Sequence, residues 1–138
     1  MVDNNGRKAT VLLVEGHDGV RAALGGKLRR LEDFDVLGDT SSPTRALDMA
    51  ARLQPDLILA DFPTTAPYAA ELCARIHQAS PVSRLVVFTA FADAETRALY
   101  SEAGVTACLL KDIGFERLMT ELRAVLRNGA NSVIPAGD

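Results

Sequence analysis

Five short runs of mostly apolar residues punctuate the chain, and the longer stretches between them carry apolar residues at every third or fourth position. The runs cover residues 10–14, 34–38, 57–60, 85–89 and 106–110. Apolar runs without polar alternation are typical of strands buried on both faces, as in a parallel sheet covered by helices. The second run is more mixed, which suits a strand nearer the edge of the sheet. The pattern predicts an α/β protein.

The stretches between and after the runs predict five helices. Four of them carry a clear apolar stripe: Val20, Leu24, Leu28 and Leu31; Ala46, Leu47, Ala50 and Leu53; Ala69, Leu72, Cys73 and Ile76; and Phe115, Leu118, Leu122, Val125 and Leu126. Asp18, Ser42 and Asp93 are each predicted to cap the start of a helix, with Pro43 in a first turn. Gly104 is predicted to end the fourth helix. That helix has few large apolar residues, so we expect it to be the least firmly held.

Strict alternation of strands and helices implies parallel strands, right-handed crossovers and helices on both faces of the sheet. We therefore expect a three-layer sandwich. A chain of 138 residues is the size of one compact domain. The alternation by itself leaves the order of the strands open.

Charge, apolar run length and cysteine positions exclude several classes of function. The formal net charge is −3, so no basic surface invites a nucleic acid as a direct partner. No apolar run has the length needed to cross a membrane, and residues 1–8 lack a signal-peptide core, so we expect a cytoplasmic protein. Cys73 and Cys108 fall inside a predicted helix and a predicted strand, where a buried thiol is commoner than a disulfide or a metal ligand.

Polar side chains follow four of the five predicted strands. In a parallel sheet these carboxyl ends lie on one rim, where α/β proteins bind their ligands. A simpler interpretation is that each residue merely ends a strand and starts a turn. The residues at the rim are Glu15, Gly16, His17 and Asp18 after the first strand, Asp61 after the third, Thr89 at the end of the fourth, and Lys111 after the fifth.

This constellation resembles a response-regulator receiver domain, and more narrowly the receiver of NarL-type transcription regulators. The resemblance implies a flavodoxin-like sheet in the order 2-1-3-4-5, with a receiver domain over residues 9–128. Residues 1–8 would then be an N-terminal arm, and residues 129–138 a tail or the start of a linker to an output domain. The matching motifs are Val14-Glu15-Gly16-His17 with Arg21 downstream, residues 55–61, residues 86–90, and Gly104 leading into Leu109-Leu110-Lys111-Asp112.

The resemblance also implies a role for each rim residue. Asp61 is the expected phosphoacceptor, whose carboxylate takes a phosphoryl group from a histidine kinase or a small acyl phosphate. Lys111 supplies a cation for the charge that develops during the transfer, and Thr89 supplies a hydroxyl that follows a phosphoryl oxygen. Mg²⁺ is expected on Glu15, Asp61 and the backbone carbonyl of Pro63.

Three departures from the family pattern stand out. The second acid after the first strand is replaced by Gly16, which is expected to weaken Mg²⁺ binding; Glu15 or Asp18 would have to compensate, although capping is the expected task of Asp18. Cys108 stands where the family often has an aromatic switch residue that swings inward after phosphorylation. Its side chain is too small to follow the movement of Thr89 in that way. The loop over residues 62–67 lacks the usual methionine-proline pair.

Two functions from different classes follow. The first is a phosphoacceptor switch that catalyses only its own phosphorylation and dephosphorylation. Its expected partner is a sensor histidine kinase, and its expected assembly is a homodimer. In a longer chain it would control a helix-turn-helix output domain. The alternative is a pseudo-receiver that acts through protein contacts without phosphorylation. A nucleotide or flavin enzyme is disfavoured because no glycine-rich phosphate loop follows the first strand.

Overall fold

Every predicted strand and helix is present in the computed structural model, which describes residues 6–128. The strands are β1 (Ala9–Glu15), β2 (Phe34–Thr40), β3 (Leu57–Asp61), β4 (Arg84–Thr89) and β5 (Ala107–Leu110). The helices are α1 (Asp18–Arg29), α2 (Pro43–Leu53), α3 (Ala66–Ala79), α4 (Ala94–Glu102) and α5 (Gly114–Asn128), with the 3₁₀ turn η1 (Lys111–Ile113) before α5. All strand pairs are parallel and the order is β2-β1-β3-β4-β5, which confirms the flavodoxin-like prediction.

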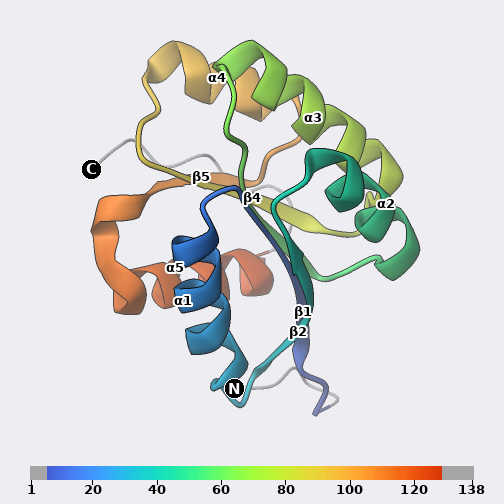
Figure 1. The fold of residues 1–138 in the computed structure, drawn as a ribbon, viewed down its shortest axis with the longest axis vertical. Coiled ribbons are helices and arrows are strands. Elements are labelled where there is room, and N and C mark those ends of the chain that lie inside the picture. Colours follow the sequence, from blue (N-terminus) through green and yellow to red (C-terminus); the bar gives the residue numbers. More distant parts are fainter. Residues whose placement is uncertain (1–5, 129–138) are drawn as a thin grey trace.

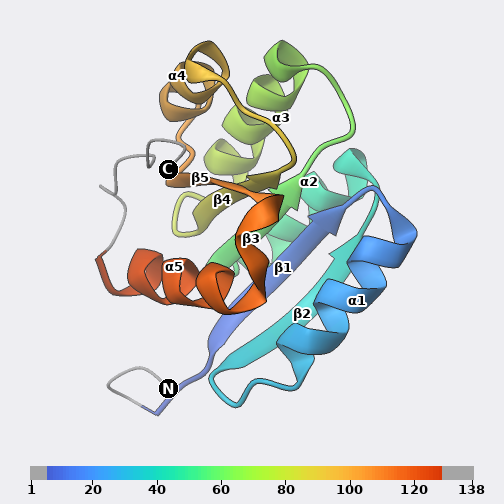
Figure 2. The same cartoon turned by 90° about the vertical axis from the view of Figure 1, so that its left-hand side faces the viewer.

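The sheet lies between two helical layers. Helices α1 and α5 cover one face, and α2, α3 and α4 cover the other (Figures 1 and 2). Successive strand residues point to opposite faces, so Val11 and Leu13 join the core under α1 and α5, while Leu12 and Val14 join the core under α2 to α4. Both faces are therefore apolar, which explains why the strands lack polar alternation.

Helix caps confirm two predictions and correct a third. Ser42 and Asp93 accept a hydrogen bond from the third residue beyond them, as N-caps do. The prediction that Asp18 caps α1 is wrong, because His17 holds the extended cap conformation and its Nδ1 accepts the Val20 N–H at 3.1 Å. Asp18 is instead the first helical residue, with its side chain 86% exposed and paired to Arg21 at 2.8 Å. It therefore points to solvent and not into the rim.

At the opposite end of the sheet, charged pairs tie chain segments together. Arg123 of α5 donates two hydrogen bonds, at 2.8 and 3.1 Å, to the buried Asp33 before β2. Arg7 pairs with Asp56 at 2.9 Å, just before β3. Cys73 and Cys108 are free thiols in the core, as expected. Nothing among the helices of residues 6–128 is both long and apolar enough to span a bilayer; the predicted tail lies outside these residues.

Candidate functional site

Strand register brings the rim residues together. Glu15 and Asp61 are direct partners across β1 and β3, and Thr89 pairs with Leu110 across β4 and β5. Lys111 follows immediately after Leu110. Because the strands are parallel, all four residues sit at the same carboxyl edge of the sheet. The rim predicted from the sequence is therefore assembled by backbone pairing alone.

The ammonium of Lys111 joins the two carboxylates. Its Nζ lies 2.7 Å from Glu15 Oε1 and 2.6 Å from Asp61 Oδ2. The Glu15 side chain is only 5% exposed, whereas Asp61 and Lys111 retain 23% and 24%. Burial alone would lower the pKa of Lys111, but the hydrogen bonds to Asp61 and Glu15 outweigh it and hold that pKa above its ordinary value. Lys111 is therefore a permanent cation at neutral pH.

Glu15 is held in place from its own strand end. The His17 backbone N–H donates to Glu15 Oε2 at 2.9 Å, so both carboxylate oxygens of Glu15 are engaged. Arg21 donates to the Glu15 backbone carbonyl at 3.0 Å. The sequence indicated Glu15 as a metal ligand; the structure shows its carboxylate oriented towards Lys111.

Pro63 occupies the space beside Gly16. A Cβ added to Gly16 would lie 3.0 Å from Pro63 Cγ, closer than ordinary van der Waals contact. Within residues 6–128 no three His, Cys, Asp or Glu side chains group in a way that could hold a metal ion. Mg²⁺ needs about six oxygen ligands in octahedral geometry, and the two carboxylates at this rim share one lysine. The side chains as arranged do not fit a divalent cation.

Cys108 lies in the core, and its neighbourhood contains two residues that the sequence analysis did not single out. Arg97 of α4 donates to the Cys108 carbonyl and to the Ala92 carbonyl, each at 3.2 Å. Tyr100 is the buried residue of α4 and packs in the same core as Cys108. Burial raises the pKa of Tyr100 to about 12. A lone tyrosine in an otherwise polar helix is the sequence feature that could have indicated Tyr100. The contacts of Arg97 and Tyr100 attach α4 to β5.

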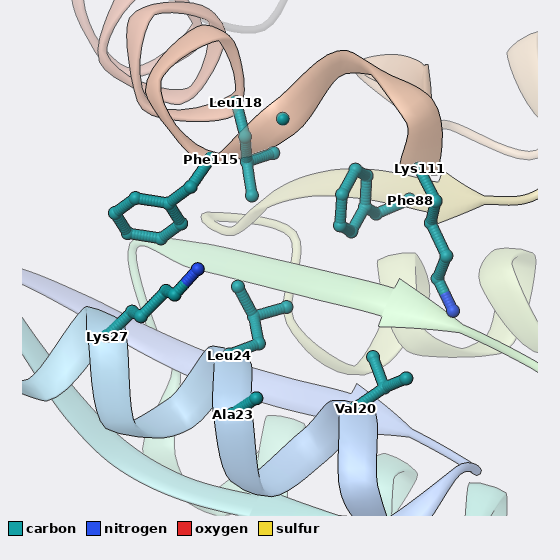
Figure 3. Close-up of a pocket in the computed structure, with 9 residues that line it drawn as sticks. Val20, Ala23, Leu24, Lys27, Phe88, Lys111, Phe115 and Leu118 are labelled. Atoms are coloured by element: carbon teal, nitrogen blue, oxygen red, sulfur yellow. The ribbon is translucent and has the colours of Figure 1, made fainter.

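An apolar groove of about 320 Å³ runs between α1 and α5 and ends at Lys111. Val20 and Leu24 line it from α1, and Leu118 from α5 (Figure 3). Figure 3 shows the Lys111 side chain passing Phe88 and its nitrogen reaching the end of β3, on which Asp61 lies. The stem of Lys111 is therefore packed in the groove, while its ammonium belongs to the rim.

Comparison with known proteins identifies the family. A family model for the response regulator receiver domain matches residues 11–123. The chain belongs to this family. Over 119 residues it is 29% identical to the nitrate/nitrite response regulator protein NarL of Escherichia coli K12, covering 86% of this chain and 55% of that protein. It is also 29% identical to the transcriptional regulatory protein LiaR of Bacillus subtilis 168, covering 83% and 54%.

A solved structure confirms the fold. A LuxR-family two-component response regulator from Aurantimonas sp. SI85-9A1 superposes with a TM-score of 0.79 at 21% identity, covering 89% of this chain and 88% of that one. The expectation of a NarL-type receiver is confirmed by these matches. Members of the family are regulatory rather than metabolic, work with sensor kinases and typically bind Mg²⁺. The chain spans about half the length of the curated relatives it matches.

Proposed function

We propose that Asp61 accepts a phosphoryl group from a sensor histidine kinase and that the rim passes this change to an output. The observation that carries the proposal is the Lys111 ammonium 2.6 Å from Asp61 at the carboxyl edge of the sheet. An aspartate at that position, oriented by a permanent cation and still 23% exposed, is both accessible and electrostatically prepared for an anionic donor.

The reaction is a transfer between oxygen or nitrogen and the carboxylate. An Asp61 oxygen forms the new bond to phosphorus while the bond from phosphorus to the donor breaks. A phosphohistidine whose other ring nitrogen carries a proton leaves as neutral imidazole, and an acyl phosphate leaves as a carboxylate. Negative charge spreads over the three transferring oxygens. Lys111 is the residue placed to neutralise that charge, since its ammonium already contacts Asp61.

The switch would run through Thr89 and α4. Thr89 ends β4 beside the rim and is partly buried, and its hydroxyl is the proposed donor to a phosphoryl oxygen. Movement of the following loop would reach Arg97, which holds both Ala92 of that loop and Cys108 of β5. Because Cys108 is too small to swing, we assign the transmission to Arg97 and Tyr100.

The output and the assembly are also proposals. Two relatives about twice as long as the matched region are a nitrate/nitrite response regulator and a transcriptional regulatory protein. By analogy we propose that residues 129–138 lead to a helix-turn-helix DNA-binding domain in a longer chain, that the protein acts in the cytoplasm, and that it forms a homodimer. The Mg²⁺ site expected on Glu15, Asp61 and the Pro63 carbonyl is not carried into this proposal, because both carboxylates are paired with Lys111.

Intact mass after incubation with acetyl phosphate and MgCl₂ tests the proposal. We expect a gain of one phosphoryl group in the native chain and none in Asp61→Asn. Asp18→Asn is the matched control, because Asp18 is an exposed carboxylate near the rim that we place outside the reaction. Equal labelling of the native chain and Asp61→Asn would refute Asp61 as the acceptor. No labelling of the native chain would favour the pseudo-receiver alternative.

A further inference from the structure

The apolar groove between α1 and α5 exists because small residues line it at two positions. Ala23 of α1 contributes only a methyl group, and Gly114 at the start of α5 has no side chain. A Cβ added to Gly114 would meet nothing within 4 Å among the described residues beyond its own turn of helix, so the space beside it is open. The resulting volume of about 320 Å³ is one at which proteins hold small organic ligands.

The groove is apolar along its length. Leu24, Phe88 and Leu118 line it with side chains that are at most 9% exposed. On α1 it extends from Val20 to Lys27, seven residues further on, which corresponds to about 10 Å at the rise of an α-helix. An unbranched hydrocarbon chain of several methylene groups fits a groove of this length and lining.

One end of the groove carries a positive charge without a carboxylate partner. The Lys27 side chain extends from α1 towards Phe115, and its Nζ lies 5.3 Å from the centre of the Phe115 ring (Figure 3). Within residues 6–128 no acidic side chain forms an ion pair with Lys27. The ammonium of Lys111, the other lysine of the groove, is engaged at the rim by Asp61 and Glu15. Lys27 is therefore the cation that a ligand in the groove can reach.

We propose that this groove binds an amphipathic carboxylate of medium chain length, with the hydrocarbon chain against Leu24, Phe88 and Leu118 and the carboxylate at Lys27. An anion is favoured over a neutral or cationic molecule of the same shape, because it supplies the negative charge that Lys27 lacks, next to apolar surface that excludes water. The site lies outside the phosphoryl chemistry of Asp61 and goes beyond the proposed function.

Titration of the ¹⁵N-labelled chain with octanoate at pH 7 and constant ionic strength tests the site. Octanamide and octylamine are the matched probes, because they keep the chain length and change the charge of the head group. We expect saturable shifts in the amide signals of residues 20–27 and 114–118, and affinities that fall in the order octanoate, octanamide, octylamine. Between hexanoate and octanoate the affinity should rise about threefold for each added methylene group, since each buries further apolar surface.

Variants separate the charge from the groove. Lys27→Gln is expected to weaken octanoate binding about threefold or more and to leave octanamide binding unchanged. Lys8→Gln is the matched control, because Lys8 is exposed and does not line the groove, and it should change neither affinity. Ala23→Leu fills the groove from an exposed position of α1 and should weaken both ligands at least about tenfold. Leucine favours helix, so this variant is expected to fold.

The proposal is overturned if octanoate and octanamide bind equally, if Lys27→Gln leaves octanoate binding unchanged, or if binding survives Ala23→Leu. Absence of saturable shifts with octanoate also overturns it. A second copy of the chain is the competing occupant: groove signals that shift with protein concentration alone, together with a dimer in sedimentation velocity that octanoate does not dissociate, would assign the groove to that interface and overturn the ligand site. None of these measurements uses a phosphoryl donor, so failure of Asp61 to accept a phosphoryl group would refute the proposed function and leave this result standing.

Discussion

The exchange Lys111→Met is predicted to destabilise the domain and to do so in a pH-dependent way. The substitution keeps a linear apolar stem that can remain in the groove and removes the ammonium that joins Glu15 to Asp61. Two carboxylates are then left side by side, one of them with a side chain only 5% exposed. The two negatively charged carboxylates repel each other, and the repulsion is stronger where water is excluded.

The magnitude follows from burial. Removing one partner of a fully buried ion pair costs about 3–5 kcal/mol. Here Lys111 and Asp61 retain 24% and 23% exposure, so water replaces part of the lost interaction. Allowing for that screening, we expect Lys111→Met to lower the free energy of unfolding by about 2–3 kcal/mol at pH 7.

The pH dependence has a defined sign. The folded-state pKa of Lys111 is raised by Asp61 and Glu15 against the opposing effect of burial. Its contribution is therefore fully present below the unfolded pKa of about 10.4 and is lost as the pH rises through the higher folded pKa. The difference between native and Lys111→Met should be constant from neutral pH to about 10 and shrink above it.

The difference in unfolding free energy between the native chain and Lys111→Met can be measured by urea unfolding. Far-ultraviolet circular dichroism is the suitable probe, because the chain has no tryptophan. Lys27→Met serves as control, because the Lys27 ammonium lies 5.3 Å from the centre of the Phe115 ring and away from the carboxylates. Loss of such an exposed cation–π contact should cost less than about 1 kcal/mol. Combining Lys111→Met with Glu15→Gln should recover part of the loss, because only one carboxylate then remains. A Lys111→Met domain as stable as the native one at pH 7 would refute the assigned role of the bridge.

Three further outcomes test the fold and its electrostatics. Arg123→Gln is expected to cost about 2 kcal/mol at pH 7. Burial raises the pKa of Asp33, but the hydrogen bonds from Arg123 and a backbone hydrogen bond outweigh it and hold that pKa below its ordinary value. The contribution of the pair is therefore present above the unfolded pKa and is lost as the pH falls through the folded one, so urea curves of native and variant should converge in acid, and a constant gap would contradict the assignment. Gly104→Ala should lower stability by about 2 kcal/mol, because φ is +95° and the new Cβ would lie 2.6 Å from the His77 ring; an unchanged melting temperature would refute this. Burial raises the pKa of the Cys73 thiol to about 12, so a thiol reagent at pH 8 should label it only at the rate of unfolding, and rapid labelling of folded protein would contradict its placement.

Much of the architecture could be predicted from sequence, because a strand buried on both faces needs apolar residues at successive positions. The run Leu57 to Ala60 is apolar at every position since alternate side chains enter different cores, and the structure confirms it as the strand before Asp61. The strand order was different in kind: alternation of elements permits several orders, and only the family resemblance supplied the one that the structure confirms.

The error at the first helix shows the limit of local signals. Asp18 and His17 are both able to accept a backbone hydrogen bond, and aspartate is the commoner cap. The choice depends on which residue takes the extended conformation after β1, and here that residue is His17. This backbone conformation follows from how the chain leaves the sheet, which residue preferences alone do not specify.

By itself the sequence determined the elements, the two-sided core and the set of polar residues at the rim, because each depends on the residue type at a position and its nearest neighbours. Only the tertiary structure decided which of those residues contact one another. Glu15 and Lys111 are 96 positions apart in sequence, and their 2.7 Å contact exists because parallel register places β1 and β5 ends on one edge with Asp61 between them. The closure of the Gly16 position by Pro63 has the same origin, since it depends on the path of a loop packed against another strand end.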